Sequence, residues 1–227
     1  MSKRIFDVTL ACAALLLLWP LLVVLALAVK LEDHGPVFYR GRRVGRLGKP
    51  FFMAKFRTMV VNAESLGASS TADDDPRITR VGRFLRKFKL DELPQLFNVL
   101  AGSMSFVGPR PQVAWAVELY SAEEKQLLAA RPGITDYASL IFRNEGEILK
   151  GSDDPDKDYL EKIAPRKIRL GCEYVRHNNV AIDARIIIAT ALAIAGVDPC
   201  WCLSPAGRAI MEQAATDQQP KVQAQAA

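Results

Sequence analysis

The chain contains 227 residues, of which 50% are hydrophobic and 24% are charged, and its formal net charge is +5. This length favours one domain with a substantial core plus an appendage. The composition argues against a disulfide framework, because Cys200 and Cys202 are too close for an ordinary bridge, and against a zinc finger, because the two histidines lack finger-like spacing.

The first 30 residues predict a membrane-associated helix. Residues 8–29 carry no charge, and a helix of that length spans about 33 Å, enough for a hydrocarbon core of ~30 Å. The run is longer than the apolar region of about 7–15 residues in a cleaved signal peptide. Pro20 lies near its middle and cannot donate a hydrogen bond to the carbonyl of Leu16, so we expect a kink there.

The charges around this helix favour the cytoplasmic side for both of its ends. Lys3 and Arg4 precede the apolar run, and Lys30 follows it. The sequence leaves two topologies open: a re-entrant helix-break-helix over residues 1–30, and a spanning helix. In both, the bulk of the protein lies in the cytoplasm.

Residues 30–89 form a basic segment, with 14 Lys and Arg against 6 Asp and Glu. Such an excess predicts a face for anionic lipid, nucleic acid or a phosphorylated substrate. Within it, aromatic and β-branched residues separated by glycines and Pro50 predict a hairpin over residues 36–59. A phosphate loop near Gly45 is excluded because the required G-x-x-x-x-G-K-[ST] spacing is absent. We expect residues 62–76 to form a mobile loop with solvated acids.

Residues 78–88 predict an amphipathic basic helix. Apolar residues recur at helical spacing among arginines and lysines, at Val81, Phe84, Leu85 and Phe88. This apolar side suits either the protein core or a membrane surface with anionic headgroups, and the sequence leaves both open.

Two adjacent acids, Asp91 and Glu92, interrupt the basic run and are the candidate chemical centre. Asp91 fits a helix N-cap, with Pro94 in the first turn. A helix N-terminus lowers the pKa of a carboxyl group, so we expect Asp91 to stay ionised, as a nucleophile must. Glu92 suits Mg²⁺, which binds a few carboxylates plus substrate phosphates. The Gly- and Pro-rich turn over residues 102–111 presents Arg110 as an anion clamp.

The C-terminal half predicts mainly helices. We expect a helix over residues 113–130, a short strand before Phe142, a helix over residues 159–175 and another from Asp183. The apolar stretch 186–197 is too short to span a bilayer, so it lies in the core or against the membrane. The Ala- and Gln-rich end, from about Gln213, predicts a disordered tail.

Several motifs in order along residues 1–195 carry a family resemblance. They are Lys3-Arg4-x-Phe6-Asp7, the apolar run broken at Pro20, Lys55-Phe56-Arg57-Thr58-Met59, Asp75-Pro76-Arg77-Ile78-Thr79-x-Val81-Gly82-x-Phe84-Leu85-Arg86, Leu90-Asp91-Glu92-Leu93-Pro94-Gln95-Leu96-Phe97-Asn98, Met104-Ser105-Phe106-Val107-Gly108-Pro109-Arg110-Pro111 and Arg131-Pro132-Gly133-Ile134-Thr135. Together they resemble the bacterial sugar transferases known as monotopic phosphoglycosyl transferases.

The resemblance implies a reaction and a fold. A sugar 1-phosphate passes from a UDP-sugar to polyprenol phosphate (undecaprenyl phosphate), with release of UMP, as the first membrane step of polysaccharide or glycoconjugate synthesis. The implied fold class is α/β, mostly helical with a small β-hairpin or sheet. One globular catalytic domain over residues 31–200 follows the re-entrant helix, and residues 201–227 form a membrane-proximal segment and tail.

The resemblance also implies residue roles and partners. Asp91 attacks the β-phosphorus and forms a covalent phosphosugar intermediate, and Glu92 binds Mg²⁺. The substrate-binding residues it implies are Lys55, Arg57, Arg86, Arg110, Pro111 and Arg143. The enzyme would sit on the bacterial inner membrane, in one leaflet, with its catalytic domain on the cytoplasmic face; no nucleic-acid partner is implied, and a homodimer is left open.

The chain departs from the family pattern at two places. Relatives commonly carry Ser-Pro where this chain has Trp19-Pro20, so a serine hydroxyl is missing at the bend. The common Gly-x-x-Gln-Val-Asn-Gly-Arg becomes residues 136–143, in which Arg143 is kept for a diphosphate or uridine contact while sugar-facing residues differ. The alternative from another class is a non-enzymatic, membrane-anchored module that binds anionic lipid or nucleic acid. It leaves the Asp91-Glu92 pair unexplained.

Overall fold

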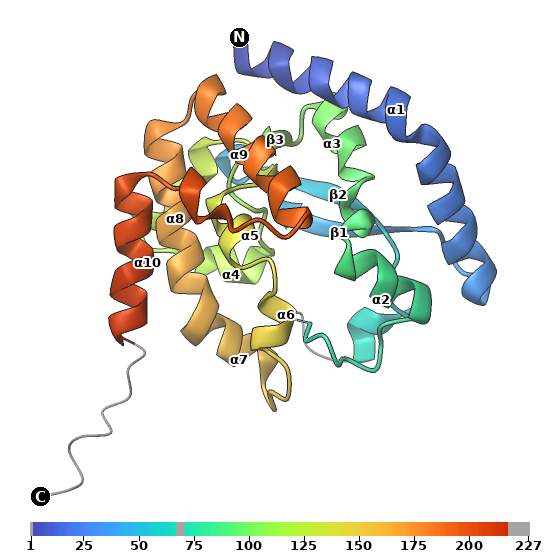
Figure 1. Ribbon diagram of the computed structural model, residues 1–227. Coiled ribbons are helices and arrows are strands. Elements are labelled where there is room, and N and C mark those ends of the chain that lie inside the picture. The colour runs from blue at the N-terminus through green and yellow to red at the C-terminus, as the bar shows by residue number, and fades with distance from the viewer. Residues whose placement is uncertain (1, 67–70, 218–227) are drawn as a thin grey trace, which may run out of the picture.

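The computed structural model describes residues 2–66 and 71–217, and these residues are mostly helical with two small sheets (Figure 1). The helices are α1 (Ser2–Asp33), α2 (Arg80–Lys87), α3 (Gln95–Ala101), α4 (Ala114–Glu118), α5 (Tyr137–Ile141), α6 (Glu145–Ile148), α7 (Pro155–Asp158), α8 (Ala164–His177), α9 (Val180–Ile194) and α10 (Pro205–Asp217). The strands are β1 (Phe38–Val44), β2 (Pro50–Phe56), β3 (Ser105–Val107) and β4 (Gly133–Thr135). The predicted fold class is confirmed.

The apolar N-terminal run forms one continuous helix, α1, and within the described residues it alone is long and apolar enough to cross a membrane. Pro20 lies inside α1, and the helix continues on both sides of it. The break expected at this proline is therefore a bend: Figure 1 shows the axis of α1 changing direction about halfway along. A proline removes one hydrogen bond and kinks a helix, which accounts for a bend without a gap.

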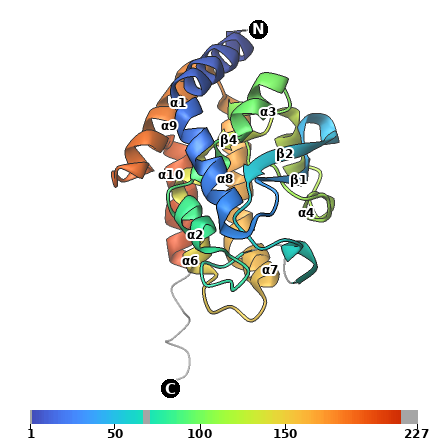
Figure 2. The same ribbon diagram turned by 90° about the vertical axis from the view of Figure 1, so that its right-hand side faces the viewer.

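Both ends of α1 are attached to the same globular body. Near its start, Asp7 is buried and accepts a 2.8 Å hydrogen bond from the hydroxyl of Ser105. At its end, Asp33 forms an ion pair with Arg57. Between these anchors the helix runs across the face of the domain, beside α2 and α3 (Figure 2). Its middle is apolar and open, with Leu17 78% exposed.

The two sheets bring distant segments together. The predicted hairpin is confirmed, because β1 and β2 pair antiparallel from Phe38 opposite Phe56 to Val44 opposite Pro50. Strands β3 and β4 pair in parallel, and the segment after β3 carries Arg110. The hairpin carries Lys55 and the segment after β3 carries Arg110. The two sheets therefore hold these two basic residues near the turn that contains Asp91 and Glu92.

Apolar residues gather in three buried clusters, and α1 contributes to two of them. The largest lies between α5, α8 and α9 around Tyr174 and Ile186. A second joins Ala11 of α1 to Met53, Val99 and Met104. The third joins Leu25 and Val29 of α1 to Phe56 and Leu85. Because it shares these cores, α1 is packed as part of the domain.

The amphipathic helix α2 has apolar side chains both in the core and at the surface. Leu85 is fully buried against α1, whereas Phe84 is 53% and Phe88 is 44% exposed. The hydroxyl of Thr79 caps α2 by accepting a hydrogen bond from the backbone N–H of Gly82. One side of α2 therefore packs in the core, and a second row of aromatic side chains lies at the surface.

Two predictions about the C-terminal half are wrong. The helix predicted over residues 113–130 is divided into α4 and a 3₁₀ helix, Glu124–Ala129, because Ser121 and Glu124 form a reciprocal capping pair that starts a new turn. The strand predicted before Phe142 is helix α5, which begins where Asp136 accepts a hydrogen bond from the backbone of Ser139.

The last described helix, α10, lies against α8 and continues through Gln213 to Asp217 (Figure 1). The composition predicts a disordered tail from about Gln213, and residues 218–227 lie outside the described residues. The four cysteines are free thiols. In α9, Ile186 is buried whereas Ile188 is 54% exposed, so its apolar stretch is only partly in the core.

Candidate active site

Asp91 and Glu92 lie on a tight turn that precedes α3. After α2, Lys89 adopts a left-handed backbone conformation (φ 56°, ψ 22°), and Leu90–Glu92 then form a 3₁₀ turn. Helix α3 begins only at Gln95, so the N-cap role predicted for Asp91 is wrong. The turn instead buries both carboxyl groups, leaving Asp91 6% and Glu92 8% exposed.

Glu92 is clamped by two cations from other parts of the chain. Lys55 of β2 places its Nζ 2.9 Å from Glu92 Oε1. Arg110 donates hydrogen bonds from both terminal nitrogens to the two Glu92 oxygens, with Nη1 3.3 Å from Oε2. Lys55 Nζ also lies 3.6 Å from Asp91 Oδ2. The positive charges expected near the acid pair are therefore in direct contact with it.

The two acids respond differently to burial. Burial raises the pKa of Glu92, but the charges of Arg110 and Lys55 outweigh it and hold that pKa well below the usual value. Burial is also the largest influence on Asp91 and, together with the charge of Glu92, raises its pKa, while Lys55 opposes the shift. The lowered pKa predicted for Asp91 is therefore wrong, because burial replaces the helix N-terminus as its main influence.

Asp91 also has an oxygen without a partner. Its Oδ1 atom is buried and has no hydrogen-bond partner among the described residues. Leaving a buried acceptor unpaired costs about 1–3 kcal/mol, so such an atom in a native site calls for a function. An unpaired carboxylate oxygen on a side chain that lies next to Lys55 can attack an electrophile with anionic oxygens, or bind a metal ion that such a molecule also contacts.

The predicted Mg²⁺ site can be compared with the side chains that are available to bind a metal ion. The described residues contain no cluster of three or more His, Cys, Asp and Glu side chains. Mg²⁺ does not require one, because it commonly takes one or two carboxylates and completes its shell with phosphates and water. The unpaired oxygen of Asp91 fits such an ion, whereas Glu92 would first have to exchange a contact with Lys55 or Arg110.

Of two further predicted residues, Arg86 acts on Asp91 through its charge and Pro111 follows Arg110 in the chain. Arg86 is half-buried on α2, and its charge lowers the pKa of Asp91. Pro111 is buried directly after Arg110. The charge of Arg86 suits a molecule that carries negative charge, and the substrate-binding role of Pro111 stays a prediction.

Arg57 and Arg143 are engaged elsewhere. Arg57 is buried and binds Asp33 together with the carbonyl oxygens of Pro36 and Met59, so it fastens the end of α1 to the hairpin. Arg143 is exposed and donates a hydrogen bond to the carbonyl of Ala193 in α9. Their substrate-binding roles stay predictions.

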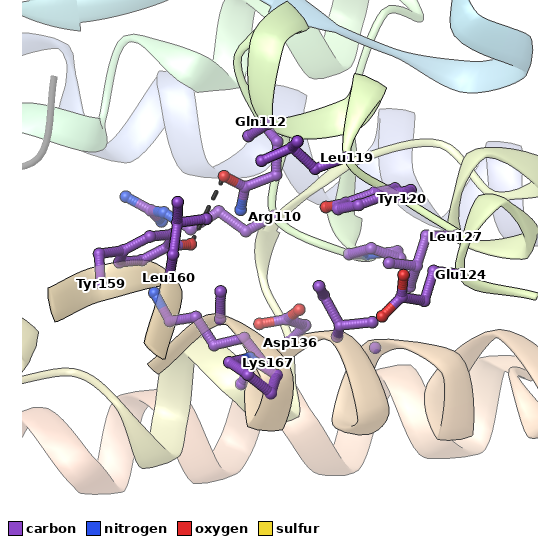
Figure 3. A pocket seen from close by; sticks show the side chains of 17 residues that line it. Arg110, Gln112, Leu119, Tyr120, Glu124, Leu127, Asp136, Tyr159, Leu160 and Lys167 are labelled. Atoms are coloured by element: carbon purple, nitrogen blue, oxygen red, sulfur yellow. Dashed lines mark hydrogen bonds between the residues drawn. The ribbon is translucent and has the colours of Figure 1, made fainter. Parts of the chain in front are cut away.

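A cavity that the sequence does not reveal has Arg110 in its lining. It has a volume of about 190 Å³ and lies between α4, the 3₁₀ helix Glu124–Ala129, the π-helix Tyr159–Ile163 and α8. Figure 3 shows the carboxyl group of Asp136 pointing into it from below, opposite Gln112. These residues are far apart in the sequence and belong to no motif, so neither spacing nor periodicity identifies them as one site.

Comparison with known proteins gives the family. A family model described as "Bacterial sugar transferase" matches residues 1–196. A UDP-glucose:undecaprenyl-phosphate glucose-1-phosphate transferase of Xanthomonas campestris pv. campestris is 40% identical over 200 residues, covering 86% of this chain and 39% of the relative. The chain thus spans less than half the length of that relative.

Two other relatives differ in their length and in the function that their names describe. Exopolysaccharide production protein ExoY of Rhizobium meliloti is 36% identical over 209 residues, covering 86% of this chain and 85% of the relative. An undecaprenyl-phosphate galactose phosphotransferase of Salmonella typhimurium is 43% identical over 158 residues, covering 63% of this chain and 33% of the relative.

Proposed function

Because the chain belongs to the bacterial sugar transferase family, we propose that it is an enzyme that transfers a sugar 1-phosphate from a UDP-sugar to undecaprenyl phosphate. The names of its relatives support this reaction, since they specify undecaprenyl phosphate as acceptor and glucose or galactose as the sugar. The products would be an undecaprenyl-diphosphate-sugar and UMP, at the start of polysaccharide or glycoconjugate assembly.

Asp91 acts as the nucleophile. One of its carboxylate oxygens attacks the β-phosphorus of the UDP-sugar, the bond from that phosphorus to the bridging oxygen breaks, and UMP leaves with the electron pair. An oxygen of undecaprenyl phosphate then attacks the aspartyl phosphosugar, and the Asp91 carboxylate departs. The unpaired, buried Oδ1 of Asp91 is the observation that carries this assignment.

The surrounding cations stabilise the phosphate charge. Lys55 and Arg110 already hold Glu92, and Arg86 acts on Asp91 from α2. Groups fixed in place before the substrate arrives need little rearrangement during the reaction, which is the main source of electrostatic catalysis. Mg²⁺ would be held by Asp91 and Glu92 and would neutralise part of the diphosphate charge.

The exposed side of α1 inserts into a single leaflet of the inner membrane, and the domain lies on the cytoplasmic face. Two observations support this topology. Both ends of α1 bind the same domain, through Asp7 and Asp33. Exposed apolar side chains continue from α1 to Phe84 of α2 and to Phe88, the residue after α2.

The test is covalent labelling of the protein by a UDP-sugar with radiolabel in the sugar. Wild-type protein without lipid acceptor should keep the label after denaturation and release UMP, and added undecaprenyl phosphate should remove the label. Asp91→Asn should not be labelled, because an amide cannot form the acyl phosphate. Asp153→Asn, on an exposed loop, is the matched control. Equal labelling of the Asp91→Asn variant would exclude Asp91 as nucleophile.

A further inference from the structure

A second unpaired polar atom lies one helical turn after Asp91. Gln95 is only 1% exposed, and its Nε2 atom is buried without a hydrogen-bond partner among the described residues. Within that part of the chain four buried side-chain atoms lack a partner, and two of the four are Asp91 Oδ1 and Gln95 Nε2. A buried donor without an acceptor costs stability, so an unpaired donor and an unpaired acceptor in one short stretch call for an explanation.

Gln95 lies on the same side of the chain as Asp91. The backbone from Leu90 to Ala101 follows one helical path, first as a 3₁₀ turn and then as α3, because Leu93 and Pro94 between them also have helical backbone angles. Residues that are four apart on such a path share a face. The two unpaired atoms therefore belong to side chains on one face.

This face is turned toward strand β2. Asn98, one turn further along α3, accepts a hydrogen bond from the backbone N–H of Ala54 and donates one to the carbonyl oxygen of Phe52, each at 2.8 Å. At the other end of the stretch, Lys55 of β2 contacts the acid pair. Gln95 lies between these two contacts, so its amide is buried on the side where Lys55 meets the acids.

The two unpaired atoms require different properties of a partner. Gln95 Nε2 can only donate hydrogen bonds, whereas Asp91 Oδ1 is an acceptor and a nucleophile. A metal ion would satisfy the oxygen of Asp91 but not the N–H group. A phosphoryl group satisfies both, because its non-bridging oxygens accept hydrogen bonds while its phosphorus bonds to the nucleophile.

We propose that Gln95 is a catalytic residue, which donates a hydrogen bond from Nε2 to a non-bridging oxygen of the phosphoryl group that Asp91 attacks. The proposal rests on the transferase function above. Phosphoryl transfer spreads charge over these oxygens, and a donor that is fixed in place before the reaction stabilises that charge. The same phosphoryl group passes from the UDP-sugar to Asp91 and then to undecaprenyl phosphate, so Gln95 acts in both steps.

The test measures the two steps separately with a UDP-sugar that is radiolabelled in the sugar. The first rate is the appearance of label on the protein without lipid acceptor, and the second is the loss of that label after undecaprenyl phosphate is added. Gln95→Met keeps the length of the side chain but removes the donor, and both rates should fall by the same factor, on the order of 10²-fold. The melting temperature should not fall, because an apolar group of the same shape replaces an unpaired polar one.

Gln95→Glu separates a hydrogen-bond donor from a metal ligand. Glutamate has nearly the same size but offers oxygens and no NH₂ group, so both rates should fall at least as far as in Gln95→Met. If Gln95→Glu kept most of its labelling, an oxygen at this position would bind the metal ion, and the proposal would be wrong. Ser139→Ala is the matched control, because it removes another unpaired buried atom, on α5, and should leave both rates unchanged.

Unequal effects on the two steps would overturn the proposal. A donor to the Asp91 carboxylate itself makes that group a weaker nucleophile and a better leaving group, so its removal would slow only the loss of label. Slower labelling alone would place Gln95 on the departing UMP. Unchanged rates, or losses that match the fraction of unfolded protein, would leave Gln95 a structural role and also overturn the proposal. Failure of the transferase function looks different, since wild-type protein would then acquire no label and release no UMP.

Discussion

Asp91 and Glu92 are neighbours in the chain, yet the protein shifts their pKa values in opposite directions. Arg110 and Lys55 hold the pKa of Glu92 well below the usual value against the effect of burial. Burial raises the pKa of Asp91, which has one unpaired oxygen and a single cation at 3.6 Å. Glu92 therefore stays ionised to a lower pH than Asp91 does.

This difference predicts the pH profile of covalent labelling. Attack requires the Asp91 carboxylate, so the labelling rate should fall as pH falls through a pKa above the ordinary value of 3.8. Lys55→Met removes the largest charge effect that lowers this pKa and should move the acid limb to higher pH. Lys55→Arg should keep the limb near its wild-type position. A uniform loss of rate at all pH values in Lys55→Met would show that Lys55 acts only on the substrate.

The clamp on Glu92 predicts a loss of stability when Arg110 is removed. Arg110→Ala removes one of the two cations that pair with the buried Glu92 carboxylate and leaves only Lys55. This should lower the free energy of unfolding by on the order of 3 kcal/mol. Arg110→Lys keeps the charge but not the bidentate geometry, so its loss should be smaller. Denaturant unfolding in detergent measures both, with exposed Arg83→Ala as control.

The same clamp predicts how that loss depends on pH. A carboxyl group with a lowered pKa in the folded state stabilises the protein above its unfolded pKa, 4.5 for Glu92, and this contribution is lost as pH falls through the folded pKa. The difference in stability between wild type and Arg110→Ala should therefore shrink in acid. A difference that is constant with pH would mean that Arg110 stabilises the fold through packing alone.

Much of this arrangement can be predicted from residue patterns. The hairpin over residues 36–59 and the basic helix near residue 80 follow from local periodicity, which the packing does not override. The identity of the acid pair follows from its contrast with the basic run. Its electrostatics do not, because the sequence shows neither the left-handed Lys89 nor the burial that raises the pKa of Asp91.

Other errors come from signals that are present but weaker than periodicity. Residues 113–130 have the spacing of one helix, yet Ser121 and Glu124 match a capping box that divides it. Asp136 likewise starts a helix where its neighbours predict a strand. The cavity has no signal of this kind, because Gln112, Asp136 and Tyr159 meet only through tertiary packing.

The attachment of both ends of α1 predicts its topology. In a background with Cys12 and Cys200 replaced, Ser2→Cys and His34→Cys should both be shielded from a thiol reagent that reaches only the periplasm. Both positions lie beside anchors to the same domain, Asp7 with Ser105 and Asp33 with Arg57. Labelling at residue 2 but not at residue 34 would mean that α1 spans the membrane.

The proposed metal site predicts a ligand-dependent change in stability. Mg²⁺ should raise the melting temperature of wild-type protein, because a ligand that binds the folded state stabilises it. The shift should be lost in Asp91→Ala, which removes the unpaired oxygen. EDTA should stop covalent labelling, and added Mg²⁺ should restore it. An equal rise of melting temperature in Asp91→Ala would mean that Asp91 does not hold the ion.

The position of Arg110 depends on two glycines that let β3 and β4 approach closely. A Cβ atom on Gly108 would lie 2.2 Å from the carbonyl oxygen of Arg131, and one on Gly133 would lie 2.1 Å from the backbone nitrogen of Gly108. The atoms that the added Cβ would meet belong to the backbone, which cannot move aside as the end of a flexible side chain can. Gly108→Ala should therefore separate the strands and destabilise the fold by about 1–3 kcal/mol or more. It should also move Arg110 away from Glu92 and lower the labelling rate.

Gly48→Ala is the control, because Gly48 lies in the turn between β1 and β2 and has nothing within 4 Å of its added Cβ atom. Its φ of +76° still makes alanine strained, at a cost of about 1–2 kcal/mol, so the control measures backbone strain without a clash. Thermal unfolding and labelling of the two variants separate these effects. Because an added Cβ on Gly48 meets no neighbour, only Gly108→Ala should lose labelling beyond what its stability explains. Equal labelling in both variants would show that the close contact of β3 with β4 does not position Arg110.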